Sequence, residues 1–371
     1  MIRRRGLAGI GAALVALCAL ATAATAQAAA PRSFFGVVPQ TPLETADLDR
    51  MGQARVGTLR FEIQWAVVDP TPAAGDSDFA GVDALVADAA RNGVRVLPFI
   101  YSTPEWVARD LDGHNCRGAE CFPFAPRSGP ARDAWQAFVA EVVARYGPGG
   151  QFWAENPLLP KVPIEALQAW NEQNSPTFYK PKPKVKAYAK LLDASHRGVR
   201  TAGGNVDVVQ GGMFGTPLGG RKPGISAWDF LDKLYDIKGA KKDFEGVAPH
   251  PYAARLKKVR AQMDLIREAI KQGRDRKVDL WVTELGWASD GPKNPLNRGP
   301  KGQANRLKQV FKFFLRKRRA WNVANVAWYS WRDNPGFTEG LCEWCPFSGL
   351  LTEDLGEKPA FRAFTRLTGG S

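Results

Sequence analysis

Two glutamates that each close an apolar run are the residues of this chain best suited to chemistry. Glu172 directly follows Asn171 at the end of one run, and Glu284 follows Thr283 at the end of another. Partial burial of a carboxyl group is costly and raises its pKa toward the working range of a general acid. Two such carboxyl groups are the minimum equipment for glycoside hydrolysis. The competing interpretation, two solvated charges at strand ends, is disfavoured because both glutamates are flanked by tryptophan.

The other predicted strand ends offer groups that a sugar site needs. Arg60 ends one strand, where a fixed cation keeps a neighbouring carboxylate ionised. His250 and Tyr252 end another and offer imidazole and hydroxyl donors. Trp331 ends the last strand and Trp106 lies in a long loop, and indole rings cover the C–H faces of sugars. We also expect several further tryptophans on or near this face: Trp65, Trp170, Trp287 and Trp344.

The elements that position these residues alternate regularly along the chain. Short β-branched or aromatic runs predict strands at 34–38, 56–65, 94–101, 164–170, 206–210, 246–250, 280–284 and 323–331. Helical patterns follow each of them, at 43–51, 82–92, 132–145, 184–201, 227–235, 254–272, 303–318 and 360–367. Strict alternation favours parallel strands with right-handed crossovers, and eight units predict a closed (β/α)8 TIM barrel. An open doubly wound sheet is disfavoured because no glycine-rich turn follows the first strand.

In such a barrel the active site lies at the C-terminal ends of the strands, where both glutamates stand. The longest insertions, 102–129, 286–301 and 332–358, follow strands at this same end. They contain two close cysteine pairs, Cys116 with Cys121 and Cys342 with Cys345. An even number of cysteines in an exported chain favours two disulfides, and a four-thiolate zinc site lacks the usual ligand spacing. We therefore expect a disulfide to restrain each of the two cysteine-containing loops at the mouth of the site.

These residues together resemble a clan A retaining glycoside hydrolase, closest to families 39 and 5, over roughly residues 32–368. The motifs that carry the resemblance are Trp-Asn-Glu ending at Glu172, Thr-Glu-Leu-Gly around Glu284, the strand ends at Arg60 and Trp331, His250-x-Tyr252, and the loop 101–106. The resemblance implies that Glu172 is the acid/base and Glu284 the nucleophile. Gln173 stands where the clan often has proline, which puts the conformation of that loop in doubt.

The first thirty residues are typical of a secretory signal peptide. Arg3, Arg4 and Arg5 precede an apolar run from about 7 to 24, and small residues such as Ala28 end the segment. An uncleaved membrane anchor is the alternative. We therefore predict a secreted protein whose catalytic domain covers 31–371, and no later segment is long enough to cross a membrane.

The chain is basic, with a formal net charge of +14 that becomes +11 without the three signal arginines. Nucleic-acid binding is disfavoured because the basic residues are interleaved with apolar ones, as on amphipathic helices. Cationic side chains in the expected cleft loops favour an anionic polysaccharide, although a generally basic surface explains the charge equally well. These side chains are Arg117, Arg127, Arg221, Lys222, Lys293 and Arg298.

The sequence thus predicts an exported enzyme that cleaves β-linked poly- or oligosaccharides with retention and needs neither metal nor cofactor. Asn171 is expected to bind the sugar 2-hydroxyl, and Arg60 and Tyr252 to position Glu284. For retention, the two carboxyl groups are expected about 5–5.5 Å apart. The alternatives are a transglycosylase on the same scaffold and a carbohydrate-binding barrel without catalysis. The two glutamates and Arg60 disfavour the last, since binding alone requires only the aromatic residues.

Overall fold

The computed structural model describes residues 30–73, 77–216, 224–337 and 342–371. The chain divides into two compact units, Met1–Pro31 and Arg32–Ser371, and all predicted site residues belong to the second. The predicted signal segment falls almost wholly on residues outside the described ranges. In the part of the chain that the structure describes, no helix is both long and apolar enough to cross a membrane.

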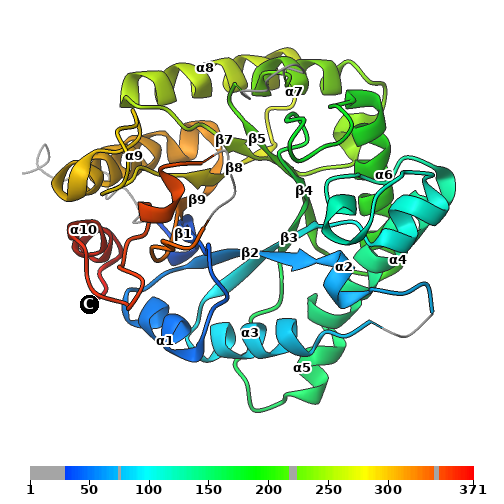
Figure 1. Cartoon of the computed structure of the whole chain (residues 1–371), viewed down its shortest axis with the longest axis horizontal. Coiled ribbons are helices and arrows are strands. Elements are labelled where there is room, and N and C mark those ends of the chain that lie inside the picture. The colour runs from blue at the N-terminus through cyan, green and yellow to red at the C-terminus, as the bar shows by residue number, and fades with distance from the viewer. Residues whose placement is uncertain (1–29, 74–76, 217–223, 338–341) are drawn as a thin grey trace, which may run out of the picture. The chain divides into compact units, whose positions relative to one another are not determined.

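Parallel strands close into a barrel, as predicted (Figure 1). Each strand pairs in parallel with its neighbours, and the pairing of β4 with β5 completes the ring. Eight positions around the barrel are filled by nine strands because β6 and β7 follow one another at the same position. The strands are β1 Phe35–Val38, β2 Thr58–Gln64, β3 Arg95–Tyr101, β4 Ala166–Asn171, β5 Asp207–Phe214, β6 Gly246–Val247, β7 Pro249–His250, β8 Asp279–Leu285 and β9 Val323–Tyr329.

Helices surround this barrel and pack against it through one apolar face each. The α-helices are α1 Thr45–Gln53, α2 Trp65–Val68, α3 Ala80–Arg91, α4 Gly129–Tyr146, α5 Gln151–Glu155, α6 Val185–Thr201, α7 Ala227–Tyr235, α8 Leu256–Gln272, α9 Gly299–Trp321 and α10 Pro359–Thr368. Short 3-10 segments lie at Arg32–Phe34, Gly118–Cys121, Ala240–Lys242 and Cys345–Phe347, with a π-helix at Trp106–Leu111. All eight predicted helices are present, with α2 and α5 in addition. The (β/α)8 prediction is confirmed.

The interior of the barrel changes character along its axis. One layer is apolar: Leu97, Ala166, Val209 and Ala248 pack together against the ring of Trp281. Nearer the C-terminal ends the inward side chains become polar, with Arg60 on β2 and Gln168 on β4 both fully buried. The apolar layer supplies the packed core of the fold, and the polar layer becomes the floor of the site.

Several strand boundaries differ from the prediction, and three of the differences bear on the site. Strand β5 continues to Phe214 through Gly211 and Gly212, and the side chains of Gln173 and His250 occupy the space that a Cβ at these two positions would fill. The predicted sixth strand is split at Ala248, and Pro249 has no N–H with which to continue the ladder. The last strand ends at Tyr329, two residues before the predicted end.

Both predicted cysteine pairs are disulfide-bonded. The Cys116–Cys121 bond joins Cα atoms 5.2 Å apart in the insertion after β3, and the Cys342–Cys345 bond joins Cα atoms 5.4 Å apart after β9. Each disulfide closes a loop of only a few residues, so it fixes local geometry more than it stabilises the whole fold.

Candidate active site

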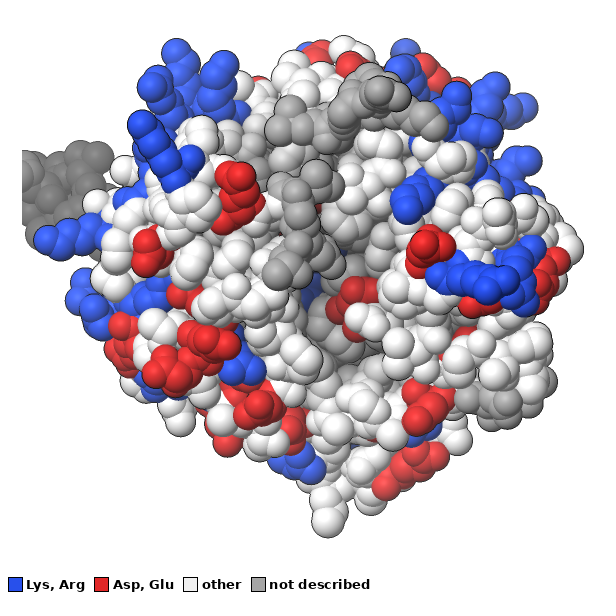
Figure 2. Space-filling model, viewed as in Figure 1, with Lys and Arg blue, Asp and Glu red and all other residues white. Residues whose placement is uncertain are grey.

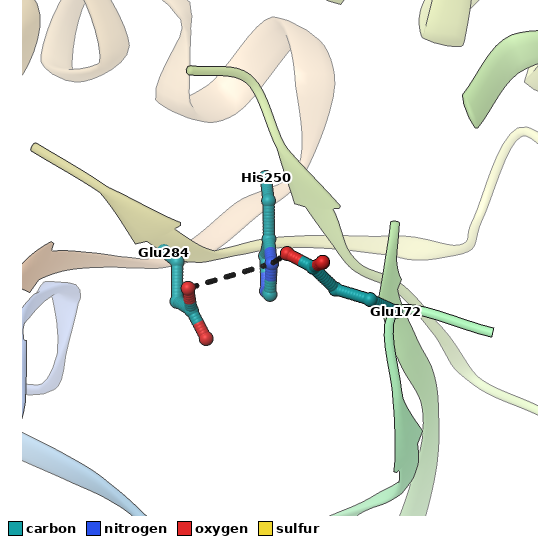
Figure 3. Close-up of side chains that lie close together, drawn as sticks. All are labelled: Glu172, His250 and Glu284. Carbon is teal, nitrogen blue, oxygen red and sulfur yellow. Dashed lines mark hydrogen bonds and ion pairs between the residues drawn. The ribbon is translucent and has the colours of Figure 1, made fainter. Parts of the chain in front are cut away.

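The two predicted carboxyl groups meet at the C-terminal end of the barrel. Glu172 directly follows β4, and Glu284 is the second-last residue of β8. One oxygen of each lies within 4.8 Å of the other, with His250 between them (Figure 3). Figure 2 shows a hollow in the middle of this face with acidic side chains inside it. The strand topology therefore brings together two residues 112 positions apart in the sequence.

Glu284 is held as an anion by its neighbours. Arg60 Nη1 donates to Glu284 Oε1 at 2.6 Å, and the Tyr252 hydroxyl donates to Oε2 at 2.9 Å. Burial alone would raise the pKa of Glu284, but interactions with His250, Arg60 and Tyr252 outweigh burial and lower it. Both oxygens are thus oriented and hydrogen-bonded, as expected for a carboxylate that must stay ionised.

The pKa of Glu172 is shifted in the opposite direction, upward. Its residue surface is only 8% exposed, and burial raises the pKa of its carboxyl group although the hydrogen bond with His250 opposes the shift. Nearby Glu284 adds repulsion that also favours the protonated form. Two neighbouring carboxyl groups whose pKa values are displaced in opposite directions are the arrangement that an acid and a nucleophile require.

His250 links the two glutamates and has no nitrogen left for a ligand. Its Nδ1 lies 2.9 Å from Glu172 Oε1 and 3.6 Å from Glu284 Oε2, and its Nε2 lies 3.0 Å from the Thr283 hydroxyl oxygen. The side chain is fully buried. The prediction that His250 binds substrate directly is therefore wrong, because both ring nitrogens are engaged; His250 is a positioning residue.

Arg60 is also a positioning residue. It is fully buried and donates to three side chains: to Glu284, to Asn171 Oδ1 at 2.8 Å, and to Gln168 Oε1 at 3.0 Å. Its guanidinium stands 4.0 Å from the centre of the Phe99 ring. Although a sugar site could use a cation at this strand end, the Arg60 side chain is fully buried and offers no surface to a ligand. Its predicted contact with Glu284 is present.

Asn171 and Tyr252 lie where they can serve both a carboxylate and a sugar. The Asn171 carbonyl oxygen accepts from Arg60, which turns its amide nitrogen away from Arg60, and the residue is 8% exposed. Among the described residues the Asn171 amide nitrogen has no hydrogen-bond partner. Tyr252 is half-buried and bonded to Glu284. The contact of Tyr252 with Glu284 is the one expected from the sequence, and the contact of Asn171 with a sugar 2-hydroxyl stays a prediction.

The predicted tryptophan platform is mostly wrong. Trp331 is fully buried: its indole N–H donates to Asp47 Oδ1 at 2.9 Å, and its ring packs edge-on against Phe361 of α10. The strand stops at Tyr329, so Trp331 has already turned into the core. Trp65, Trp170 and Trp287 are buried as well. Trp106 is half-buried, and its indole N–H donates to the Asp69 carbonyl oxygen. Of the tryptophans expected to form the platform, only Trp106 and Trp344 keep part of their surface exposed.

A smaller aromatic group, made of Tyr252, Tyr329 and the expected Trp344, borders Glu284. Trp344, 8% exposed, packs 5.1 Å from Tyr252 between ring centroids, and Tyr329 packs 6.1 Å from Trp344 and 6.3 Å from Tyr252. Trp344 lies inside the loop closed by Cys342 and Cys345. The disulfide loop after β9 therefore supports the tyrosine that holds Glu284.

Three residues that complete the site were not predicted. Thr283 is hydrogen-bonded to His250, and Gln168 accepts a hydrogen bond from Arg60. Gly212 leaves space for the His250 ring, which a Cβ at position 212 would overlap. Thr283 and Gln168 carried a detectable signal, since each is a polar residue inside an otherwise apolar strand. Gly212 carried none, because its role depends on the pairing of β5 with β7, which places the His250 ring beside it.

The basic residues expected in the cleft do not converge on the glutamates. Arg127 Nη2 donates to the Lys180 carbonyl oxygen at 2.7 Å, and Arg298 Nη2 donates to the Ala254 carbonyl oxygen at 2.6 Å, so both brace loops. Arg117 and Lys293 are exposed. The other two, Arg221 and Lys222, lie outside the described residues.

Neither a known protein-family profile nor a curated protein matches this sequence. Solved structures do match its fold. A family 39 glycoside hydrolase from Bacteroides cellulosilyticus WH2 aligns with a TM-score of 0.65 at 20% identity, covering 91% of this chain and 64% of that one. The GH39 enzyme from Xanthomonas axonopodis pv. citri gives 0.63 at 15%, covering 92% and 67%. A GH5_18 enzyme from Bifidobacterium longum subsp. longum gives 0.61 at 16%, covering 91% and 78%.

At such low identity the likeness shows a shared fold. The two families that the sequence resembles, 39 and 5, are both represented among these structures. The chain spans just under two thirds of the length of the Bacteroides protein. The fold expected from the resemblance is confirmed.

Proposed function

We propose that this protein is a retaining glycoside hydrolase acting on β-linked poly- or oligosaccharides. The observation that carries the proposal is the pair of glutamates within 4.8 Å of each other with pKa values displaced in opposite directions. A short separation favours retention, because inversion requires room for a water molecule between carboxyl group and sugar. The fold shared with family 39 and GH5 enzymes supports the same class.

The reaction takes place in two displacements. The Glu284 carboxylate attacks the anomeric carbon and forms a glycosyl ester, while the protonated Glu172 gives its proton to the departing glycosidic oxygen. The Glu172 carboxylate then removes a proton from water, whose oxygen attacks the anomeric carbon and releases Glu284. Each displacement inverts the configuration at the anomeric carbon, so the two together retain it.

The surrounding residues orient the two glutamates and bind the sugar. Arg60 and Tyr252 fix both Glu284 oxygens, so the nucleophile is ionised and aimed before substrate arrives. His250 keeps Glu172 in reach of the same reaction centre. The Asn171 amide nitrogen is the donor for the sugar 2-hydroxyl. The GH5_18 structure from Bifidobacterium longum is described in complex with Manb1-4GlcNAc, which makes β-linked oligosaccharides the first substrates to test.

The stereochemistry of the first product tests the proposal. Proton NMR of a reaction on an aryl β-glycoside should show the β-anomer of the sugar first, before mutarotation. The aryl glycosides are chosen by screening β-linked sugars in parallel. Initial appearance of the α-anomer would rule out retention, and no turnover on any β-linked glycoside or polysaccharide would rule out the proposed activity.

The pH dependence of kcat/KM should be bell-shaped and broad. Glu284 must be ionised, and because its pKa is lowered, activity is lost only when the pH falls well into the acid range. Glu172 must be protonated for the first step, and because its pKa is raised, activity is lost only as the pH rises above the usual glutamate range. The two limbs belong to the coupled pair. A pH–rate profile on an aryl glycoside measures both, and a single narrow optimum below the usual glutamate pKa would contradict the assignment.

Metal chelation should leave activity unchanged. Glu172, His250 and Glu284 each offer one ligand atom within 4.8 Å of the others, which raises the question of a metal site. The residues fit one poorly, because both Glu284 oxygens already accept hydrogen bonds and the Arg60 guanidinium lies 2.6 Å from one of them. A divalent cation there would be repelled by Arg60. Assays after dialysis against EDTA check this; loss of activity that added Zn²⁺ or Ca²⁺ restores would contradict it.

The proposal includes export and an anionic polymer as substrate. Residues 1–30 have the composition of a signal peptide, and the remaining chain has a net charge of +11. N-terminal sequencing of secreted protein tests export. Electrostatic steering predicts a higher kcat/KM on a uronate-containing polymer than on a neutral one, with a preference that weakens as salt rises. Equal rates at all salt concentrations would contradict the anionic substrate.

A further inference from the structure

A second concave surface lies away from the glutamates, where the exposed side of α6 meets the end of α7 and the start of α4. Its volume is about 620 Å³, within the range of ligand-binding pockets. Among the described residues that line it, Asp236 is the only carboxylate. Six others are cationic: Arg127, Arg132, Lys184, Lys186, Lys190 and Lys233. Figure 2 shows basic side chains gathered at the upper right, over the region of α6 in Figure 1. We call this surface the basic pocket.

The lysines of the basic pocket are available to a ligand. Lys184, Lys186, Lys190 and Lys233 are exposed, and within the described ranges none of them forms an ion pair with a carboxylate. Unpaired like charges this close repel one another, so an anion that binds among them relieves the repulsion. The start of helix α6 adds further positive potential from its backbone N–H groups.

The two arginines give the basic pocket a fixed edge. Arg127 Nη2 donates to the backbone oxygens of Lys180, at 2.7 Å, and Lys182, at 3.2 Å, and its guanidinium stands 5.3 Å from the centre of the Tyr179 ring. Arg132 Nη1 in turn donates to the Arg127 carbonyl oxygen. This side of the pocket is therefore preorganised, while the lysines on the other sides can adjust to a ligand.

The shape and composition of the basic pocket indicate what it binds. Val185, Ala187 and Ile237 supply apolar surface between the cations, and sugar rings present apolar C–H faces. The cations are spread over three helices or their ends, which suits charges spaced along a chain better than one compact phosphate. None of the described residues that line the pocket is aromatic, so they offer no platform on which nucleic-acid bases could stack.

We propose that the basic pocket binds a segment of a carboxylate-bearing polysaccharide, such as a run of uronate residues, and holds the polymer on the enzyme outside the catalytic hollow. The carbohydrate identity of the ligand rests on the proposed function; the anionic character rests on the pocket alone. None of its lining residues contacts Glu172 or Glu284 in the described part of the chain. Bound polymer raises the local concentration of cleavable segments, so the pocket improves action on long chains and not on small glycosides.

Binding of polygalacturonate by the full-length mature chain carrying Glu284→Gln tests the proposal without turnover. The pocket variant combines Lys186→Glu, Lys190→Glu and Lys233→Glu, and a second combines the same positions as glutamine to guard against misfolding. The control combines Lys301→Glu, Lys308→Glu and Lys312→Glu, three exposed lysines of α9 with the same change in total charge. Thermal unfolding confirms that all variants fold. Affinity is measured at low and moderate salt by titration calorimetry.

We expect the pocket variants to bind polygalacturonate at least about ten-fold more weakly than the control, which keeps its affinity within about two-fold. Added salt should weaken binding of the parent protein. With an active Glu284, the pocket variant should act normally on an aryl glycoside and more slowly on the polymer. Equal losses in pocket and control variants would mean diffuse surface charge and overturn the site. Tighter binding of single-stranded DNA than of polygalacturonate would overturn the ligand class.

The outcomes also separate this inference from the proposed function. An enzyme that turns over β-glycosides but does not bind polygalacturonate would sink the inference and leave the proposed activity standing. A protein that binds polygalacturonate through these lysines but cleaves no glycoside would do the reverse.

Discussion

Replacing Glu284 by glutamine is expected to reduce kcat on an aryl glycoside by a factor on the order of 10⁴–10⁶, comparable to the loss of other catalytic nucleophiles. Glutamine keeps an oxygen that can accept from Arg60, so the fold is preserved while the nucleophilic charge is removed. In the parent protein, a 2-fluoro glycoside should form a stable ester, and peptide mass spectrometry should find the label on Glu284. A label on another residue would contradict the assignment.

Glu172→Ala should behave differently from the nucleophile variant. On a substrate with a good leaving group the first displacement needs no acid, so the glycosyl ester should accumulate and turnover should be limited by its hydrolysis. Azide, which needs no general base, should restore turnover and yield a β-glycosyl azide. If azide instead rescued the Glu284 variant and gave the α-azide, while leaving Glu172→Ala inactive, the nucleophile would be Glu172.

The second large effect is expected from Arg60→Met. The change leaves Glu284 without its cation and removes the donor shared by Asn171 and Gln168, all within a buried layer. Breaking a buried ion pair in this way typically lowers the free energy of unfolding by about 3–5 kcal/mol. The acid limb of the kcat/KM profile should also move to higher pH, because the guanidinium no longer favours the Glu284 anion.

A matched control separates the effect of Arg60→Met from the effect of losing any arginine charge. Arg95 forms an ion pair with Glu165 in which both side chains are about half exposed, so Arg95→Met should cost no more than about 1 kcal/mol and leave the pH profile in place. Urea unfolding and pH–rate measurements on both variants provide the comparison. Similar destabilisation by the two changes would contradict the role given to Arg60.

Features that depend on local pattern could be predicted from the sequence, and those that depend on alignment across the barrel could not. Alternation of strands and helices specified the (β/α)8 fold, and a carboxyl group at the end of each of two apolar runs specified the glutamates. The direct ligand role given to His250 failed because the sequence does not reveal that Glu172 and Thr283 engage both ring nitrogens.

The tryptophan platform failed for a related reason. Whether an indole at a strand end faces the hollow or the core depends on the residue at which the strand stops, and β9 stops at Tyr329. Trp331 therefore binds Asp47 in the core, and the disulfide loop supplies Trp344 instead. The basic pocket was equally hidden, because its cations come from segments between Arg127 and Lys233 that only the fold assembles.

Gly212 has a consequence for how much variation the barrel wall can absorb. Its backbone aligns with Asn171, and the space above it is filled by the imidazole that joins the two glutamates. Gly212→Ala should therefore lower kcat by displacing His250. Gly81→Ala is the matched control, since a Cβ there meets nothing within 4 Å and alanine favours the α3 helix. In a saturation library selected for activity, position 81 should accept many residues and position 212 only glycine; recovery of larger residues at 212 would contradict this.

A single added methyl group on β5 would thus be enough to impair the proposed reaction, so the tolerance of position 212 to mutation is set by side-chain volume and not by polarity or charge.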